Sequence, residues 1–343
     1  MAKVVIASKL LALISNTISN DQGASFRQAL ETIIPKMDDA YRGHDDPFRS
    51  HLGASLIGKK CKRELAYGFK WTKIPSFESR ILRLFNRGHL EEARFIAMLI
   101  AAGIDVWYET EDGGQFRVID IEGHFGSALD GIVRGVPDMP LVPMYAEFKT
   151  HNDKSFKSLV NNGVEKGKNQ HFIQTQMCMY SYKLEYALYM AVNKNDDTLY
   201  AEIIKYDPKI AEWYLKSARE IIYNDTLPER ISESPGWYEC KFCDFRVNCH
   251  SLVIPEINCR TCSHSKPLDT GGASWKCKLF KEPIDKTRQM KGCLSHLINP
   301  ALLSGTIAVS GSIPNNTVTI EYKGKQVEYG YDLIPLMELI NET

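Results

Sequence analysis

The chain lacks the long hydrophobic run that a membrane-spanning helix requires. No apolar stretch in its 343 residues approaches the roughly 20 consecutive apolar residues of such a helix. The apolar start, residues 1–15, is interrupted by Ser8 and Lys9, and no small-x-small cleavage site follows, which argues against a secretory signal peptide. We therefore expect a soluble protein with no membrane partner.

The sequence also lacks an excess of charge of either sign. Its 42 lysine and arginine residues equal its 42 aspartate and glutamate residues, so the formal net charge is zero. Net charge therefore gives no argument for a nucleic-acid partner, although a neutral total is compatible with a basic groove beside an acidic metal site. The length suits one large domain or two modest domains.

A complete phosphate-binding P-loop is missing as well. Residues 53–60, Gly-Ala-Ser-Leu-Ile-Gly-Lys-Lys, nearly match the pattern, but they end in lysine where the motif needs serine or threonine for its metal ion. No clear strand precedes them. The sequence therefore predicts no ATP-driven motor in this chain.

Cysteine, in contrast, is abundant toward the C-terminal end. Most of the nine cysteines lie between Cys240 and Cys293, a pattern that fits metal binding better than a disulfide framework and indicates a reducing, cytoplasmic compartment. A first group has C-x-x-C-x5-C spacing and an apparent upstream partner. Soft thiolates select iron–sulfur clusters or zinc. The members of this first group are Cys61, Cys240, Cys243 and Cys249.

A second cysteine group follows the first. It opens with a C-x-x-C pair and continues with two loosely spaced cysteines, an arrangement typical of a zinc ribbon or knuckle, with His264 and His296 as alternative ligands. Buried thiols without a metal, or participation in the first group, are the alternatives. Cys178, between two methionines, is most simply a core thiol. The members of the second group are Cys259, Cys262, Cys277 and Cys293.

The order of the expected elements predicts an α/β fold with a mixed central sheet flanked by helices. A polar, lysine-rich loop is expected after the fourth strand, and Asp112-Gly113-Gly114 predicts a hairpin turn between the first two. The expected elements are a helix at 78–102, strands at 105–110, 116–121, 128–133 and 144–150, a helix at 170–183, strands at 186–193 and 199–206, and a helix at 210–224.

The first long helix carries a glutamate on an otherwise apolar face. Glu92 shares its stripe with Gly88 and with apolar residues at helical spacing. A neighbouring stripe holds Glu91 instead, so periodicity alone does not choose between the two glutamates. A carboxylate on such a face needs a partner, because burying an unpaired charge is costly. The plain alternative is a glutamate at the flank of the helix that forms a salt bridge.

Two expected strands add further charged residues. Asp130 lies inside a strand sequence, although aspartate is a poor strand former. Glu147 and Lys149 are two residues apart on the next strand and therefore point to one face. Together with a helix glutamate, these side chains suit a hard divalent cation such as Mg²⁺, which keeps several waters and leaves room for a phosphate. Taken singly, each residue also fits an ordinary solvated charge.

The second long helix places three polar residues, Gln176, Tyr180 and Lys183, on one face. An amide, a phenol and an ammonium group in a row suit contacts with a phosphate backbone or with base edges. An exposed polar helix face without a ligand is the alternative.

In this order, the motifs resemble the RecB-like branch of the PD-(D/E)XK nucleases. The resemblance spans roughly residues 55–250, and its pieces are weak singly but specific together. Relatives often carry histidine where Glu92 stands, so the chain is here more similar to phage-lambda-type exonucleases. The four pieces are Gly88-x-x-x-Glu92, Asp130-Gly131, Glu147-Phe148-Lys149 and Gln176-x-x-x-Tyr180.

This resemblance implies a restriction-endonuclease-like core and metal-dependent hydrolysis of DNA. Asp130, Glu147 and the carbonyl of Phe148 would hold Mg²⁺ or Mn²⁺, and Glu92 would complete that site or a second one nearby. The residues that the resemblance implies for the remaining roles are Lys149, which would orient the attacking water or stabilise developing charge, and Gln176 and Tyr180, which would position the strand.

The first cysteine group is similar to the iron–sulfur staple of the AddB nuclease domain and of CRISPR-adaptation nucleases. That similarity implies a [4Fe–4S] cluster on Cys61, Cys240, Cys243 and Cys249, with zinc in the same four thiolates as the alternative.

The chain is thus expected to have four parts. These are a helical region at 1–75 that carries the first cluster cysteine, a nuclease core with its staple at 76–252, a zinc-binding module at 253–300, and a hairpin plus helix at 301–343.

The expected activity is that of a DNA exonuclease acting in recombination, repair or end processing. Its substrate would be single-stranded DNA or DNA with free ends, and a helicase or single-strand-binding protein would be its partner. A non-catalytic nucleic-acid-binding or assembly protein on the same fold is one alternative, although the motif acids and lysine are intact. A structure-specific endonuclease is the other.

Overall fold

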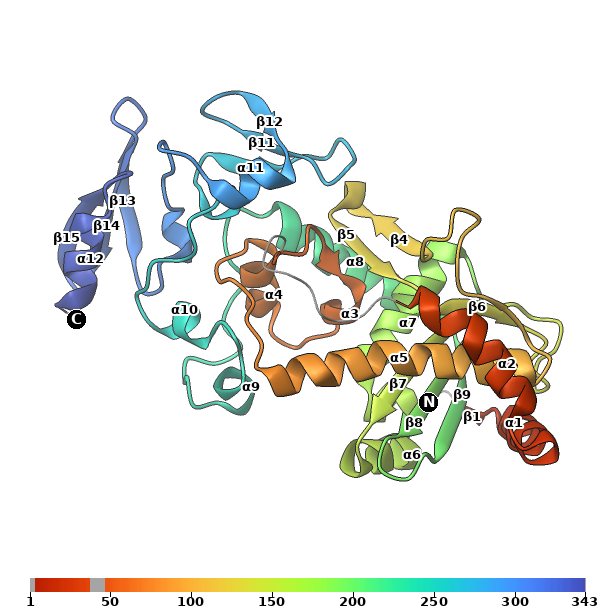
Figure 1. The fold of residues 1–343 in the computed structure, drawn as a ribbon. Helices are drawn as coiled ribbons and strands as arrows, with labels where there is room; N and C mark the ends of the chain where they lie inside the picture. Colours follow the sequence, from red (N-terminus) through yellow and green to blue (C-terminus); the bar gives the residue numbers. More distant parts are fainter. Residues whose placement is uncertain (1–3, 38–46, 343) are drawn as a thin grey trace.

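The computed structural model describes residues 4–37 and 47–342, and its centre is a mixed six-stranded sheet (Figure 1). In spatial order, the strands are β1 (Val5–Ile6), β9 (Leu199–Lys205), β8 (Tyr186–Asn193), β7 (Met144–His151), β6 (Gly131–Arg134) and β3 (Asp105–Trp107). Only β7 and β8 run parallel among these neighbours; the other pairs are antiparallel. The predicted fold class, a mixed sheet flanked by helices, is confirmed at this level.

Helices cover both faces of the sheet. On one face lie α1 (Ser8–Asp21), α2 (Ala24–Ile33) and α5 (Ser79–Ala101); on the other lie α6 (Asp153–Gly167) and α7 (Asn169–Tyr182), with α8 (Pro208–Tyr223) against α7. Alternate side chains of β7 point to opposite faces of the sheet. Ala146 and Phe148 belong to the core under α5, whereas Tyr145 belongs to the core under α7.

The predicted hairpin before β7 is wrong. β3 pairs with β6 in the central sheet, whereas β4 (Arg117–Asp120) pairs with β5 (Phe125–Ala128) in a second sheet that β2 (Leu52–Gly53) completes. The turn itself forms, since the Gly113 N–H donates to the Thr110 carbonyl at 2.9 Å. The two strands diverge after the turn into different sheets.

The expected strand at 128–133 is also wrong, because it is split between these two sheets. β5 ends at Ala128 and β6 begins at Gly131, so Leu129 and Asp130 form the junction. Asp130 does not sit inside a strand, in keeping with the poor strand propensity of aspartate.

The lysine-rich segment after β7 is a helix, α6, rather than the predicted loop. Asn152 caps it, accepting a hydrogen bond from the Ser155 N–H at 2.9 Å. Phe156 and Leu159 are buried on its inner side. Gly163, with φ of 68°, interrupts the helix near its end and obscures the apolar periodicity in the sequence.

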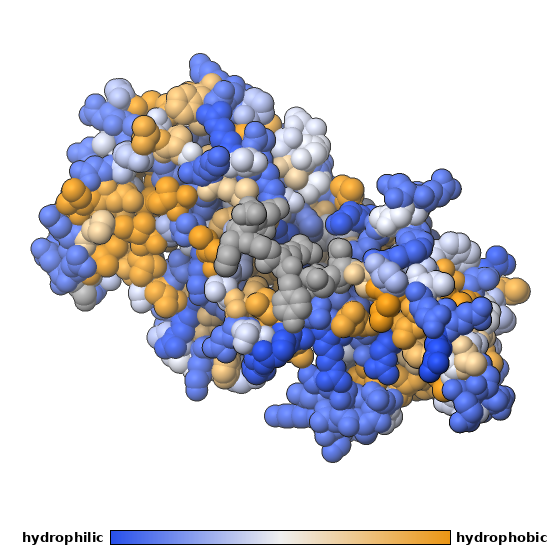
Figure 2. Space-filling model, in the orientation of Figure 1, coloured by the Kyte–Doolittle hydropathy of each residue, from blue (hydrophilic) through white to orange (hydrophobic). Residues whose placement is uncertain are grey.

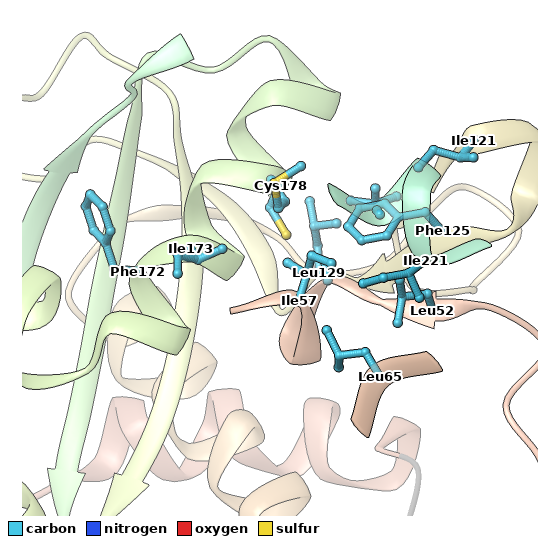
Figure 3. Packing of buried hydrophobic residues seen from close by; sticks show 14 of the residues in the cluster. Leu52, Ile57, Leu65, Ile121, Phe125, Leu129, Phe172, Ile173, Cys178 and Ile221 are labelled. Atoms are coloured by element: carbon cyan, nitrogen blue, oxygen red, sulfur yellow. The ribbon is translucent and has the colours of Figure 1, made fainter. Parts of the chain in front are cut away.

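A second apolar core links the N-terminal segment to the helical layer (Figure 3). It gathers residues such as Leu52, Ile57 and Phe125 around α7, where Cys178 is fully buried as the expected core thiol. Short helices border this region: α3 (Ala54–Ile57), α4 (Lys62–Phe69), α9 (Tyr238–Lys241) and α10 (Arg246–His250).

The C-terminal part contains two small antiparallel sheets. Residues 307–329 form three strands, one more than the predicted hairpin, and a short helix follows. Figure 2 shows apolar side chains on the surface at the left, where this tail lies. Ile307, Ile334 and Met337 of the tail are exposed. The elements are η3 (Cys259–Thr261), β10 (Ser265–Pro267), β11 (Trp275–Cys277), β12 (Glu282–Ile284), α11 (Lys286–Lys291), β13 (Ile307–Ser312), β14 (Thr317–Tyr322), β15 (Lys325–Tyr329) and α12 (Ile334–Asn341).

Short 3₁₀ turns complete the fold: η1 (Ile34–Lys36), η2 (Ile121–Gly123) and η4 (Pro300–Leu302). Within 4–37 and 47–342, the helices are all too short or too polar to cross a membrane.

Candidate active site

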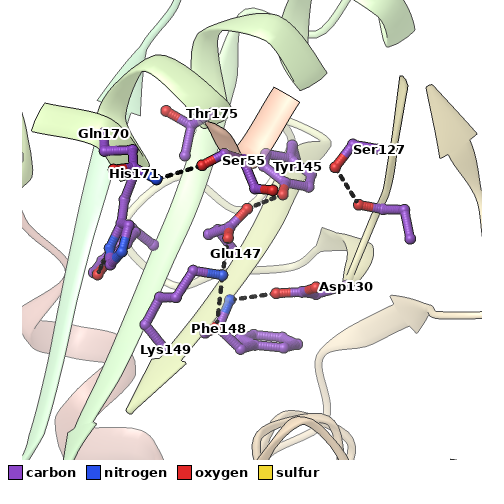
Figure 4. A network of polar contacts seen from close by, with 12 residues as sticks. Ser55, Ser127, Asp130, Tyr145, Glu147, Phe148, Lys149, Gln170, His171 and Thr175 are labelled. Carbon is purple, nitrogen blue, oxygen red and sulfur yellow. Dashed lines mark hydrogen bonds and ion pairs between the residues drawn. The ribbon is translucent and has the colours of Figure 1, made fainter. Parts of the chain in front are cut away.

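Strand β7 presents a polar row on the face that carries Glu147. Tyr145, Glu147, Lys149 and His151 alternate along it with apolar residues of the other face. The Glu147 side chain is fully buried, and the Tyr145 hydroxyl donates to its Oε2 (Figure 4). Lys149 forms an ion pair with Glu147 Oε1 and remains 26% exposed. This row therefore holds a buried carboxylate next to a lysine that reaches solvent.

Asp130 is tied to the same strand from the junction between β5 and β6. Its Oδ2 accepts a hydrogen bond from the Phe148 N–H at 2.7 Å, and Lys149 Nζ donates to the Phe148 carbonyl at 3.2 Å (Figure 4). The carboxyl group of Asp130 thus lies beside β7, close to Glu147 and Lys149. The break between β5 and β6 allows this contact. In a continuous strand, the Asp130 side chain would point away from the plane of the sheet and not toward the backbone of β7.

Helix α5 supplies the third acid, and it is Glu92 rather than Glu91. Burial, together with repulsion from Asp130 and Glu147, raises the pKa of Glu92 to about 9. Glu91 is buried elsewhere on the helix and pairs through Oε2 with Arg94 at 3.0 Å. The structure thus separates the two glutamates that periodicity left open.

The electrostatics of the cluster follow from three acids around one lysine. Burial raises the pKa of Glu147 to about 7, although the neighbouring Lys149 favours its charged form. Burial disfavours the charge on Lys149, but the carboxylates of Glu147 and Asp130 outweigh burial and raise its pKa above the usual value. With all three acids ionised, the cluster carries more negative than positive charge and would be stabilised by a bound cation.

The residues fit a divalent cation in donor chemistry and charge, since carboxylate oxygens and a backbone carbonyl are ligands that Mg²⁺ prefers. Within residues 4–37 and 47–342, however, the structure contains no group of three or more histidine, cysteine, aspartate or glutamate side chains arranged to hold a metal ion. At this site, Lys149 forms an ion pair with Glu147, and the Phe148 N–H donates to Asp130. A cation would have to compete with those donors.

Gln176 and Tyr180 on α7 differ in their exposure to solvent. Gln176 is fully buried, its Nε2 donates to the Lys205 carbonyl at 3.1 Å, and its Oε1 accepts from the Asp207 N–H at 2.7 Å. It therefore fixes the connection from β9 to α8, and the alternative of an exposed polar helix face is wrong for this residue. Tyr180 is 39% exposed, and Lys183 lies beyond the end of the helix.

A histidine–tyrosine network extends the row of β7 and was not expected from the sequence. The Tyr189 hydroxyl lies 3.0 Å from His151 Nε2 and 2.9 Å from His171 Nδ1, and Ser155 Oγ lies 3.0 Å from His151 Nδ1. The sequence contains a signal for part of this network. Tyr145 and His151 continue the alternation of Glu147 and Lys149 on β7, so they are expected on the same face of the strand. Lys168 reaches Ser155 Oγ at 2.6 Å and brings a second cation to this end.

All four cysteines of the first group line one cavity. Cys61 precedes α4, and Cys240, Cys243 and Cys249 come from the α9–α10 segment. Neighbouring contacts hold the two segments together: Tyr67 stacks on Phe245 with 5.9 Å between ring centroids. The thiols are free, so the donor set fits an iron–sulfur cluster or zinc in kind.

The second group lines a separate cavity in the C-terminal part. Cys259, Cys262, Cys277 and Cys293 surround it, together with His264 and His296. The expected gathering of these four cysteines around one cavity is therefore present.

Comparisons with known proteins give distant likenesses only. No model of a known protein family matches the chain, and no curated protein matches it. Among solved structures, that of LHK-Exo in complex with dAMP has a TM-score of 0.36 and 16% identity over 50% of this chain and 86% of that one. A structure of LHK-Exo, an alkaline exonuclease from Laribacter hongkongensis, has a TM-score of 0.34 and 16% identity over the same shares. The structure of SSO0001 has a TM-score of 0.36 and 14% identity over 66% of this chain and 93% of that one. Likenesses of this size assign the chain to no family.

Proposed function

We propose that the chain is a metal-dependent DNA exonuclease of the PD-(D/E)XK type, with its active site at Glu92, Asp130, Glu147 and Lys149. One observation carries the proposal: acids from α5, from the β5–β6 junction and from β7 lie close enough to repel one another, and a lysine on β7 is paired with one of them. Repulsion among buried acids lowers the stability of the folded chain, and such unfavourable clusters of charge are found mainly at functional sites.

The residues of the chain would divide the work as follows. A bound Mg²⁺ or Mn²⁺ would supply Lewis-acid activation of water and of the phosphate. Asp130, Glu147 and the Phe148 carbonyl would hold the cation, with Glu92 completing that site or a neighbouring one. Tyr145 would keep Glu147 oriented through its hydroxyl.

Lys149 is the residue placed to act on the reacting groups. Its raised pKa keeps it protonated at neutral pH, and it is partly exposed. A charged ammonium group there would orient the attacking water or stabilise charge that develops on the phosphate. Tyr180 on α7 is also partly exposed and would contact the DNA strand. Gln176 is buried and would act only by stabilising the connection from β9 to α8.

The proposal includes a [4Fe–4S] cluster on Cys61, Cys240, Cys243 and Cys249. Its support is the cavity that the four thiols share, although they come from segments about 180 residues apart. Such a cluster would fasten the N-terminal segment to the end of the core. Zinc in the same thiolates is the alternative, and iron content decides between them.

The test is cleavage of end-labelled linear single-stranded and double-stranded DNA, with circular DNA alongside, in Mg²⁺ or Mn²⁺. We expect loss of linear substrate only, and no cleavage by Asp130→Asn, which keeps an acceptor for the Phe148 N–H. Glu91→Gln is the matched control, because it removes a neighbouring buried acid that pairs with Arg94.

Other outcomes identify the alternatives. Cleavage of circular DNA would indicate an endonuclease. Tight DNA binding without cleavage in either metal would favour a non-catalytic nucleic-acid-binding protein. Full activity of Asp130→Asn would remove the proposed site.

A further inference from the structure

The second cysteine group has a geometry of its own, separate from the candidate active site. Three of its thiols are buried, with exposed fractions of 8% for Cys259, 8% for Cys262 and 9% for Cys277, whereas Cys293 is exposed. All four line one cavity. We propose that this cavity is a structural zinc site with Cys259, Cys262, Cys277 and Cys293 as its ligands.

Two short turns deliver the buried sulfurs. Cys259 and Cys262 flank η3, whose start is fixed by reciprocal capping between Asn258 and Thr261. Cys277 ends β11, and the chain turns there so that the Phe280 N–H donates to Cys277 Sγ at 3.5 Å. Turns of this length around a cysteine are the units from which zinc knuckles are built.

Backbone N–H groups also point at the sulfurs. Besides the Phe280 contact, the Leu297 N–H donates to Cys262 Sγ at 3.5 Å. Hydrogen bonds to sulfur are common in the second shell around cysteine ligands of metals.

Cys293 is assigned as the fourth ligand in preference to a histidine. Its side chain lines the same cavity as the three buried thiols and is exposed. His264 Nε2 lies 2.6 Å from Asn316 Oδ1, and His296 Nε2 lies 3.0 Å from the Asn258 carbonyl. Each imidazole is thus anchored by a contact outside the cavity, and the four sulfurs form the simplest ligand set.

The surrounding fold is of the kind that a structural metal stabilises. β10, β11 and β12 are three residues each, and such short strands bury little apolar surface by themselves. The sulfurs surround the cavity rather than meeting at one point, in keeping with the lack of a ready metal cluster among the described residues. Zinc binding would therefore draw the side chains inward, and exposed Cys293 has room to move.

The decisive experiment uses the exposure of Cys293. The full chain, purified anaerobically, is alkylated with and without a zinc chelator, and each cysteine is followed by peptide mass spectrometry. An exposed free thiol reacts at once, so we expect Cys293 to be protected until the chelator is added and then to react together with Cys259, Cys262 and Cys277. Immediate alkylation of Cys293 in the zinc-containing protein would overturn the ligand assignment.

Metal analysis of two variants tests the same proposal independently. Cys293→Ser changes an exposed side chain, so it should fold, and it should lose about one zinc per chain without changing iron content. His296→Ala should keep its zinc. Loss of iron instead of zinc from Cys293→Ser, or loss of zinc from His296→Ala with retention in Cys293→Ser, would contradict the proposal. Neither readout depends on nuclease activity.

Discussion

The carboxylate of Asp130 accepts a hydrogen bond from the backbone N–H of Phe148 at 2.7 Å, and this contact joins two sheets at the candidate active site. Asp130 lies where the chain leaves the small sheet of β5 and enters the central sheet at β6. Phe148 lies between Glu147 and Lys149 on β7. The junction between the sheets and the position of Asp130 beside β7 therefore have one structural cause.

Asp130→Asn should stabilise the protein when no metal is bound. The amide oxygen can still accept from the Phe148 N–H, and the repulsion of the Asp130 charge with Glu92 and Glu147 is removed. Lys149 loses the attraction of Asp130 but keeps its ion pair with Glu147. We expect the free energy of unfolding to rise by about 0.5–2 kcal/mol, the usual gain when a functionally strained residue is relaxed. Denaturant unfolding in EDTA measures it.

The same variant should lose the stabilisation that Mg²⁺ provides. A ligand that binds only the folded chain raises the melting temperature in proportion to its affinity. Wild-type protein should therefore melt at a higher temperature in Mg²⁺ than in EDTA, and Asp130→Asn should not. An equal Mg²⁺ effect in both proteins would place the cation elsewhere.

The contribution of Glu92 to stability in EDTA should fall as the pH rises from about 5 to about 9. The pKa of Glu92 is raised from 4.5 to about 9 in the folded chain, so the folded state holds a proton that the unfolded state releases. The resulting stability is complete below the unfolded value and is lost as pH passes the folded value. Glu147, with a pKa of about 7, adds to the lower part of this range.

Glu92→Gln should flatten this pH dependence, and Glu91→Gln should leave it unchanged. The two glutamates are adjacent on α5, but only Glu92 lies near the other acids; Glu91 pairs with Arg94. Thermal unfolding between pH 5 and pH 9 compares the variants. Equal slopes for wild type and Glu92→Gln would show that Glu92 does not carry the effect.

Lys149→Met should destabilise the fold strongly. It leaves the fully buried Glu147 without its cation, and breaking a buried ion pair from one side typically costs about 3–5 kcal/mol. The double variant Glu147→Gln, Lys149→Met should recover most of this loss, because no buried charge remains. Both proteins should be inactive on DNA.

A double-mutant cycle by denaturant unfolding provides the measurement for this pair. Additive losses in the two single variants and the double variant would mean that Glu147 and Lys149 are not coupled in solution.

Residues on short, regular elements were the easiest part of the site to predict. Glu147 and Lys149 follow from the period of two on a strand whose bounds the sequence gives to within one residue. Asp130 was recognised as out of place in a strand, but the split between two sheets depends on long-range pairing of β3 with β6 and of β4 with β5. The turn residues 112–114 predict a turn, but they do not predict with which strand β3 or β4 pairs.

Gln176 shows the opposite case. Its helical spacing with Tyr180 suggested an exposed polar face, yet α7 is buried on most sides, with Phe172, Met177 and Met179 around it. Gln174 and Thr175 are buried in α7 as well, and a buried polar side chain must form hydrogen bonds within the fold. The burial of α7 depends on the helices and strands packed around it, which neither the spacing of three polar residues nor the composition of the helix reveals.

Arg260 connects the second cysteine group to the rest of the chain, and replacing it should release that contact. It lies inside the C-x-x-C pair, is 3% exposed, and donates to the carbonyls of Phe69 at 3.0 Å and Ser50 at 2.9 Å. Its guanidinium carbon lies 3.7 Å from the ring centroid of Trp71. A planar group that both stacks and donates in several directions is needed here, and lysine cannot replace it.

We therefore expect Arg260→Met to lower the free energy of unfolding by about 3 kcal/mol, because the buried Phe69 carbonyl and the buried Gln289 Oε1 lose their donor at about 1–3 kcal/mol each, and the part-buried Ser50 carbonyl loses its donor as well. Arg260→Lys should recover only part of this, since one ammonium group cannot reach both carbonyls and stack on Trp71. Arg288→Lys is the matched control, because Arg288 lies nearby but is 40% exposed in its pair with Glu282. Hydrogen exchange should show early opening at Phe69 and Ser50 in the Arg260 variants alone. If Arg260→Met unfolds like Arg288→Lys, the link between the cysteine group and the core must lie in other contacts.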